Sequence, residues 1–340
     1  MQILQSLTQF IRRQPVYISW LIKGIIFILF ATLLWYEFSS RDDMEKIQNA
    51  FLTQYGGDKI FWLYLTLAFM PLNWAAETMK WLHLIRHSEP ISFLKAYKAV
   101  LAGVTFSIFT PNRVGEFGGR ILFLKSRNAI KGIFSTIVGS WAQQIVLITF
   151  GFLGFSYFLV VLWNAEKIIL QGVIFLGMCL IGLMFFMFLN LEILVPVFKK
   201  IKWLYRFPRV IKNVNIIRHY TKWELGKTLF WAFARYFLYS LQYYWIVLFF
   251  GINVSIEKGL SCIATIYLLQ TSIPLPPIFG LVARGEIALK VWGLSDANPI
   301  SILAATFTLW IINLIIPAFI GLIFILNANL LKSLGYEKNP

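Results

Sequence analysis

Long apolar segments recur along the whole chain, and they limit the folds that it can adopt. Crossing a hydrocarbon core of about 30 Å takes roughly 20 helical residues, and six segments reach that length. Because a backbone in lipid must satisfy its own hydrogen bonds, these segments are expected to be helices. The expected spans cover residues 17–37, 60–80, 132–158, 168–190, 228–250 and 299–326. The sequence therefore predicts an all-α polytopic membrane protein.

The composition leaves no room for a separate soluble catalytic domain. Hydrophobic residues make up 59% of the chain and charged residues 14%, a balance typical of membrane proteins. The longest polar stretch, 191–227, is too short and too basic to form its own core, and it is interpreted as a basic cytoplasmic linker. Cys179 and Cys262 lie inside apolar runs, and no His or Cys spacing matches a metal motif. We expect one integral membrane domain over residues 1–340, with no metal and no cofactor.

Two short motifs interrupt the apolar pattern with helix breakers and charges. The first is Thr110-Pro111-Asn112-Arg113-Val114-Gly115-Glu116, and the second is Pro274-Leu275-Pro276-Pro277 followed by Arg284-Gly285-Glu286. Because an ionisable group at bilayer depth costs roughly 2.5–3.5 kcal/mol, both motifs are expected to serve a polar site. The apolar pieces that flank them are too short for a full crossing, so the sequence predicts two helical hairpins. These pieces are residues 94–110, 113–127, 258–273 and 279–292.

The distribution of basic residues predicts the topology. The segments expected in the cytoplasm hold 22 Lys and Arg residues, against six in the segments expected outside. By the positive-inside rule both termini are cytoplasmic, residues 94–127 enter from and return to the cytoplasm, and residues 258–292 enter and leave on the outer side. Two short complete spans in place of each hairpin would satisfy the same parity. The cytoplasmic segments are 1–23, 80–98, 120–131, 199–227 and the residues after 331.

The order of spans and hairpins repeats in the opposite orientation. Residues 17–158 form the first repeat and residues 168–326 the second, with corresponding segments 164 to 168 residues apart. Arg113 and Arg284 are separated by 171 residues. Hydropathy alone gives about eight transmembrane segments. Inverted repeats with broken helices near the bilayer midplane are typical of transporters, so the architecture favours transport over catalysis.

The charged motif residues are suited to a phosphate. Arg113 and Arg284 offer bidentate donors, while Glu116 and Glu286 are expected to pair with them, bind a cationic part of a substrate or carry a proton. An alternative is that each Arg–Glu pair only fixes its hairpin. Further candidate substrate-binding residues are Asn112, Glu77, Arg235 and Gln143, with helix–helix hydrogen bonding as the alternative role for Gln143. The residues expected to shape the hairpin tips are Pro111, Gly115, Pro274, Pro276, Pro277, Gly280 and Gly285.

Both motifs resemble the lysylphosphatidylglycerol synthase transmembrane-region family. The resemblance rests on Pro111-Asn112-Arg113-Val114-Gly115-Glu116 after a helix with Ser107 and Thr110, and on Gly280-Leu281-Val282-Ala283-Arg284-Gly285-Glu286. It covers roughly residues 15–330 and implies a lipid flippase domain of the bacterial inner membrane. Family members that aminoacylate phosphatidylglycerol carry a cytoplasmic transferase domain. Because the chain ends at Pro340 without one, we expect a stand-alone member that does not use aminoacyl-tRNA.

The resulting hypothesis is a flippase or transporter for a phosphate-bearing lipid. Its expected partners are membrane lipids, either an anionic phospholipid or a polyprenyl phosphate, and a homo-oligomer stays open. Nucleic acid is not expected, because positive-inside topology already explains the basic excess. One alternative is a polytopic glycosyl- or lipid-transferase acting on a lipid-linked substrate, with Asp42 and Asp43 as base or metal ligands. Another is a lipid-binding scaffold for a partner protein.

Overall fold

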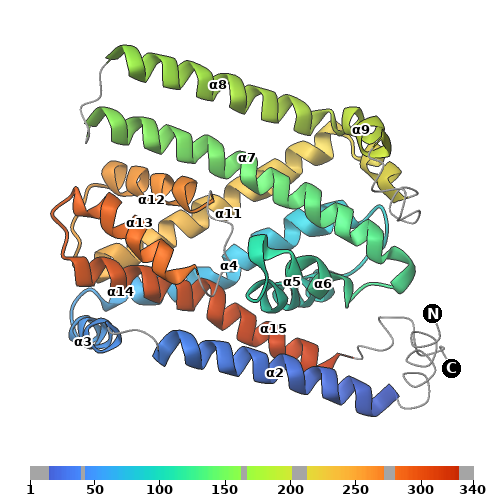
Figure 1. Cartoon of the computed structure of the whole chain (residues 1–340), viewed down its shortest axis with the longest axis horizontal. Coiled ribbons are helices and arrows are strands. Elements are labelled where there is room, and N and C mark those ends of the chain that lie inside the picture. The colour runs from blue at the N-terminus through green and yellow to red at the C-terminus, as the bar shows by residue number, and fades with distance from the viewer. Residues whose placement is uncertain (1–14, 40–42, 162–166, 201–212, 272–279, 329–340) are drawn as a thin grey trace.

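A computed structural model describes residues 15–39, 43–161, 167–200, 213–271 and 280–328, and this part of the chain forms helices and turns without a strand. In Figure 1, α7 and α8 lie along one edge of the fold, and α15 and α2 lie along the opposite edge. Helices α4 and α11 cross the middle and pack against each other. The predicted all-helical fold is confirmed for the described residues.

Every predicted full span corresponds to a helix or an unbroken helical run. Within the described residues, three stretches are both long and apolar enough to cross a membrane, namely Ser126–Tyr157, Leu170–Leu189 and Pro299–Asn327, and the fold is consistent with a polytopic membrane protein. Helices α4 and α11 are 26 and 28 residues long, but α4 carries the buried charges of Glu77 and Lys80, and α11 carries the partly buried Arg235. The long elements are α2 (Pro15–Ser39), α4 (Ile60–Ile85), α7 (Ala129–Val161), α8 (Lys167–Leu189), α11 (Lys222–Phe249), and the run of α14 (Pro299–Trp310), the π-helix η6 (Ile311–Ile315) and α15 (Ile316–Asn327).

Two helices pack against each other at each predicted hairpin position, and each pair is called a hairpin below. In the first, α5 (Phe93–Ser107) packs against α6 (Gly115–Ile121), and the short 3-10 helix η1 (Pro111–Arg113) joins them. In the second, α12 (Ile256–Thr271) packs against α13 (Leu281–Gly293). Each hairpin also packs against the last helix of the opposite half of the chain, α5 on α15 and α12 on α7. The halves are therefore interlocked.

The helix predicted over residues 113–127 is wrong in its second half. Helix α6 ends at Ile121, and a turn leads to the 3-10 helix η2 (Ser126–Asn128) and directly into α7. Lys125 has an extended backbone, with φ −66° and ψ 138°, and its amide donates to the carboxylate of Glu89 at 2.9 Å. The backbone donor that would continue the helix is thus used by a side chain from another loop.

Glu89 joins the two ends of the first hairpin. It lies between α4 and α5, and its Oε2 also accepts a hydrogen bond from Asn128 Nδ2 at 3.0 Å, next to the Lys125 amide. Lys95 Nζ lies 3.4 Å from its other oxygen. Burial raises the pKa of the Glu89 carboxyl, but the hydrogen bonds from Asn128 and Lys125 and the charge of Lys95 outweigh it, so the pKa falls below its ordinary value. The chain therefore enters and leaves this hairpin at the same end of the molecule.

The start of α11 changes the expected limits of the basic linker. Thr221 and Glu224 form a capping box that starts α11 at Lys222, so the last residues of the predicted linker 191–227 belong to a long helix. The other short elements are α3 (Met44–Tyr55), η3 (Leu191–Ile193), α9 (Leu194–Lys200) and η5 (Val214–His219).

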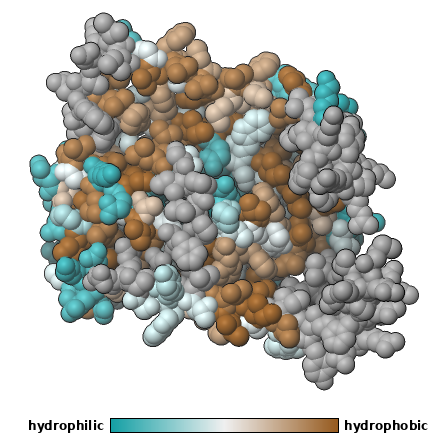
Figure 2. Space-filling view, in the orientation of Figure 1, coloured by the Kyte–Doolittle hydropathy of each residue, from teal (hydrophilic) through white to brown (hydrophobic). Residues whose placement is uncertain are grey.

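Large apolar side chains cover much of the outer surface. Figure 2 shows hydrophobic residues over most of one face, and α8 exposes Phe175 and Leu176 by more than 60% each, at 68% and 61%. Exposed apolar patches of this extent mark contact with lipid or another protein. Together with the apolar helices, this surface supports a membrane location.

A glycine at the crossing of α5 and α15 provides a test of this packing. A Cβ on Gly321 would collide with the backbone of Leu101 and lie 2.5 Å from Thr105 Oγ1, whose hydroxyl donates to the Ala318 carbonyl at 2.7 Å. We expect Gly321→Ala to lower the free energy of unfolding by about 1–3 kcal/mol, through overpacking. Thermal unfolding in detergent measures the loss. The matched control is Gly182→Ala on α8, where a Cβ meets nothing within 4 Å; equal melting temperatures for the two variants would contradict the packing.

Candidate functional site

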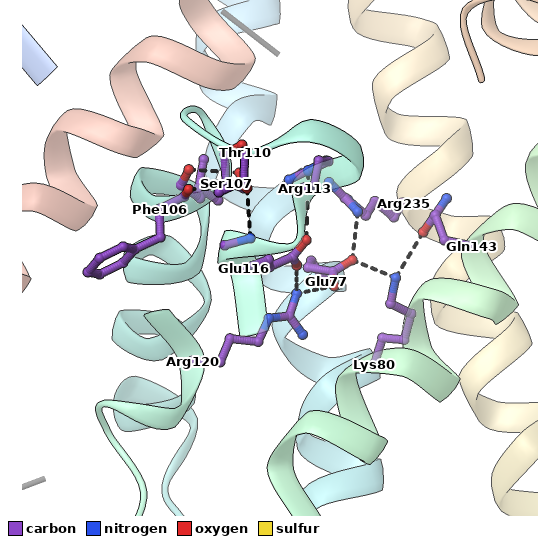
Figure 3. Close-up of polar contacts among 12 residues, drawn as sticks. Glu77, Lys80, Phe106, Ser107, Thr110, Arg113, Glu116, Arg120, Gln143 and Arg235 are labelled. Atoms are coloured by element: carbon purple, nitrogen blue, oxygen red, sulfur yellow. Dashed lines mark hydrogen bonds and ion pairs between the residues drawn. The ribbon is translucent and has the colours of Figure 1, made fainter. Parts of the chain in front are cut away.

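A buried carboxylate on α4, Glu77, is the centre of an ion cluster (Figure 3). Its Oε2 lies 2.6 Å from Lys80 Nζ and 2.7 Å from an Arg235 nitrogen, and its Oε1 lies 2.6 Å from an Arg120 nitrogen. Glu77 is 3% exposed, and Lys80 and Arg120 are 1% exposed each. Charge-assisted hydrogen bonds of this kind are among the strongest in proteins. They join α4, α6 and α11 at one point.

The tip of the first hairpin is tied to the same cluster. Glu116, on α6, accepts from Arg120, and its Oε2 lies 3.7 Å from Arg113 Nε. Asn112 and Arg113 both have left-handed backbones, with φ 50° and 59°. A left-handed conformation is uncommon outside glycine and costs about 1–3 kcal/mol for a side chain that does not favour it, so the surrounding contacts must hold the turn. One of them is the 2.7 Å hydrogen bond from the Gly115 amide to Thr110 Oγ1.

Two asparagines connect the middle of α4 to the last helical run. Asn73 Nδ2 donates to Asn313 Oδ1 at 2.9 Å, and Asn313 lies within the π-helical segment η6. A π-helical turn inside an α-helical run often marks a functional site. The partner atoms Asn73 Oδ1 and Asn313 Nδ2 are buried and have no hydrogen-bond partner among the described residues. The pair thus leaves one acceptor and one donor unused.

A cavity of about 370 Å³ lies between the two hairpins and the central helices. Three of its lining residues are arginines, Arg113, Arg235 and Arg284, and none of the described lining residues is Asp or Glu. Arg113 Nε and one of its terminal nitrogens are buried without a hydrogen-bond partner among the described residues. The other lining residues are Asn73, Trp74, Asn112, Gln143, Gln144, Leu147, Tyr236, Tyr239, Tyr267, Gln270, Thr271, Trp310, Asn313 and Leu314.

The cluster and cavity together carry more positive than negative charge. The cluster and the cavity lining together hold five cationic side chains and two carboxylates, Glu77 and Glu116, which gives a net charge of +3, and Arg284 is the one of the five that pairs with neither carboxylate. Aromatic rings supply part of the balance, since the guanidinium of Arg235 lies 4.8 Å from the centre of the Trp74 ring. An excess of partly buried positive charge is costly unless an anion is present. The site is therefore arranged to receive an anion.

The structure brings most of the predicted site residues together. Asn112, Arg113, Gln143, Arg235 and Arg284 line the cavity, while Glu77 and Glu116 lie in the adjoining ion cluster. Gln143 also bridges the two, because its Oε1 accepts from Lys80 at 3.1 Å and its Nε2 donates to the Ala232 carbonyl at 3.3 Å.

Glu286 lies away from this group. It is exposed on α13, does not line the cavity and forms no ion pair with Arg284 in the described part of the chain. The prediction that Glu286 pairs with Arg284 is therefore wrong for the described structure. Residues two apart on a helix point about 200° from each other, whereas Arg113 lies in the left-handed turn before α6, with its Nε 3.7 Å from Glu116 Oε2. The two motifs are alike in sequence but differ in geometry.

The predicted tip residues fall into two groups. The first group lies at helix starts or close contacts, as predicted for tip residues. Pro111 begins η1, and Gly280 precedes α13. A Cβ on Gly115 would lie 2.9 Å from Thr110 Oγ1, and a Cβ on Gly285 would lie 3.0 Å from Leu303 on α14. The second group lies outside the described residues and consists of Pro274, Pro276 and Pro277, together with Asp42 of the transferase hypothesis.

Lys80 and Arg120 are site residues that the sequence interpretation missed. The charge distribution assigns both to cytoplasmic segments, but the structure buries them in the ion cluster. Their spacing carries the missed signal: Lys80 is three residues after Glu77, and Arg120 is four residues after Glu116. Opposite charges at these separations share a helix face.

The fold and site define a helical membrane protein with a polar, arginine-lined cavity inside an apolar exterior. The family described as the lysylphosphatidylglycerol synthase TM region matches residues 20–321. The chain belongs to this family, and the membership predicted from the two motifs is confirmed. No curated protein and no solved structure matches the chain significantly.

The ion cluster predicts a strong dependence of stability on Glu77. In Glu77→Gln the three cations lose a shared charge, and breaking a buried pair in this way costs about 3–5 kcal/mol. We expect a large fall in the melting temperature measured in detergent.

The matched control is Glu286→Gln, the same change at an exposed position, which should leave the melting temperature unchanged. If Glu77→Gln does not fold, Glu77→Gln combined with Lys80→Met should recover folded protein, because it removes one of the stranded cations. A Glu77→Gln variant as stable as the control would rule out the cluster as a structural centre.

Proposed function

We propose that the protein moves a lipid with a phosphate-bearing head group across the bacterial inner membrane. The observation that carries the proposal is the charge of the cavity, where three arginines converge and no carboxylate lies among the described lining residues. Guanidinium groups bind phosphate oxygens in bidentate fashion. A head group held there would supply the missing negative charge while its hydrocarbon tail stays in lipid.

The arrangement of the hairpins supports a transport cycle. Arg113 comes from the tip of the first hairpin and Arg284 from the first turn of α13 in the second, so each hairpin contributes one arginine to one cavity. The packing of α5 on α15 and of α12 on α7 has the correspondence that an inverted repeat requires. In such a repeat, alternating movement of the two halves opens a central site to each side in turn.

The ion cluster has a positioning role in this proposal. Glu77 fixes Arg235 at the cavity wall and Arg120 on α6, and Arg120 in turn holds Glu116 beside Arg113. A bound phosphate would compete with the carboxylates for the guanidinium groups. Binding of the head group could thereby loosen the contact between the first hairpin and α4. The transferase alternative rests on Asp42 and Asp43, of which Asp42 lies outside the described residues.

The proposal predicts that transport depends on the two hairpin arginines. In vesicles containing phosphatidylglycerol with a fluorescent acyl label, we expect Arg113→Ala and Arg284→Ala each to slow movement between leaflets about tenfold or more, since a lost bidentate contact is worth at least about 1.4 kcal/mol. Accessibility of the label to an external quencher measures the rate.

Arg86→Ala removes an exposed arginine at the end of α4 and is expected to keep the wild-type rate. The melting temperature of each variant separates lost transport from lost folding. Wild-type rates in both hairpin variants would exclude the arginines as head-group ligands.

The proposed topology places both flanks of each hairpin on one side of the membrane. After Cys179 and Cys262 are replaced by Ser, single cysteines at Pro90 and Ser126 should react with an impermeant reagent only from the cytoplasmic side. Cysteines at Glu257 and Asp296, beside α12 and α14, should react only from outside. All four positions are exposed or lie in exposed loops. Labelling of Pro90 and Ser126 positions from opposite sides would show that the first hairpin crosses the membrane completely.

A further inference from the structure

The cavity is also lined by neutral polar side chains, which a phosphate alone would leave without a ligand contact. Beyond the arginines, its polar lining consists of neutral side chains, among them the amides of Asn73, Gln144 and Asn313. Amides both donate and accept hydrogen bonds, as hydroxyl groups do. Asn73 is 2% exposed and Asn313 5% exposed, and the hydrogen bond between them fixes both amides at the cavity wall.

Three tyrosines, Tyr236, Tyr239 and Tyr267, also line the cavity. The rings of Tyr239 and Tyr267 are stacked, with centroids 5.1 Å apart and planes 7° apart, and the Tyr267 hydroxyl donates to the Tyr239 carbonyl at 3.3 Å. Tyr236 meets Tyr267 edge to face at 6.0 Å. Because each ring is fixed by another, the wall is a rigid, partly apolar surface with polar tips. Binding sites for uncharged polar molecules combine such surfaces with a few hydrogen-bonding groups.

The same cavity is unfavourable for a cationic head group. An ammonium group has three donors and no acceptor, and here it would face Arg113, Arg235 and Arg284 without a described carboxylate on the wall. Glu77 and Glu116 are already bonded to cations. The segment 272–279 between α12 and α13 contains no Asp or Glu in its sequence. Like charges repel, so the ammonium group of a lysyl or ethanolamine head group would add no binding free energy in this cavity.

We infer that the head group consists of a phosphate joined to an uncharged, hydroxyl-rich group, and that this group is a sugar. The inference rests on the proposed function, because the arginines are taken to hold the phosphate. The sugar hydroxyls bond to amides that line the cavity, among them Gln144 and Gln270, and the faces of the sugar ring lie against the tyrosine wall. A volume of about 370 Å³ lies at the small end of ligand pockets, which suits a head group of one sugar and one phosphate.

Binding of soluble head-group analogues tests the inference. Titration calorimetry on the full chain in detergent would compare α-D-glucose 1-phosphate, inorganic phosphate and O-phosphoethanolamine. We expect the dissociation constant of glucose 1-phosphate to be about tenfold or more below that of phosphate. Phosphoethanolamine should bind no more tightly than phosphate, because its ammonium group meets the arginines.

Variants separate the two halves of the cavity. Tyr239→Leu should bring the affinity for glucose 1-phosphate down to that for phosphate while leaving phosphate binding intact, whereas Arg284→Ala should weaken both. Tyr64→Leu, at an exposed tyrosine on α4, is the matched control and should bind both anions as the wild type does. A melting temperature near that of the wild type confirms that each variant is folded.

The outcomes distinguish this inference from the proposed function. Equal affinity for phosphate and glucose 1-phosphate, or tighter binding of phosphoethanolamine, would overturn the sugar and leave the phosphate site in place. Unchanged glucose 1-phosphate binding in Tyr239→Leu would also overturn it. Binding of none of the three anions would contradict the anion site itself, and with it the proposed function.

Discussion

The carboxylate of Glu77 is the interaction on which the centre of this structure depends. It lies on the long helix α4, and three cations, one each from α4, α6 and α11, converge on it within 2.7 Å. An unpaired charge in a membrane interior is costly, so each partner constrains where the others can lie. Helix α6 has only seven residues, too few to hold its place by apolar packing alone. The ion cluster therefore positions the first hairpin, and through Arg113 it positions one wall of the cavity.

The sequence predicted the helices well and the site less completely, for physical reasons that differ. A span is determined by the length of its apolar run, which is a local property, so the predicted spans and hairpins fall on α2, α4, α5, α7, α8, α11, α12, α13 and the last helical run. Burial of a charge depends on partners from other helices. Lys80 and Arg120 were assigned to cytoplasmic segments because each lies near a span end, and only the fold brings Arg120 to Glu77, 43 residues away in sequence. The turn after Ile121 was missed for the same reason, because Glu89 in another loop takes the Lys125 amide.

The two motifs are similar in composition but are used differently. In the first, Glu116 approaches Arg113 at the start of α6, and Glu116 and Arg120 connect the left-handed turn at Asn112 and Arg113 to Glu77 on α4. In the second, Arg284 faces the cavity and Glu286 faces outward. One arginine is thus partly neutralised within the protein and the other has no carboxylate among the described residues. The two arginines are therefore not equivalent, because Arg113 pairs with Glu116, whereas Arg284 pairs with no carboxylate in the described part of the chain.

The positions of the arginines and lysines along the chain set the three cavity arginines apart from the other basic residues. Of the 31 basic residues, only Arg113, Arg235 and Arg284 belong to neither the cytoplasmic nor the outer segments of the predicted topology, and these are the three that line the cavity. The predicted positive-inside topology does not account for these three, and the structure adds Lys80 and Arg120, which it buries in the ion cluster beside them. A buried guanidinium is retained against its desolvation cost when it has an anion to bind. A cationic lipid would add to that cost, whereas a phosphate offsets it, and neutral hydroxyl groups can use the amides and tyrosines that remain. The charge of the cavity therefore argues for an anionic head group even though the family takes its name from a lysyl lipid.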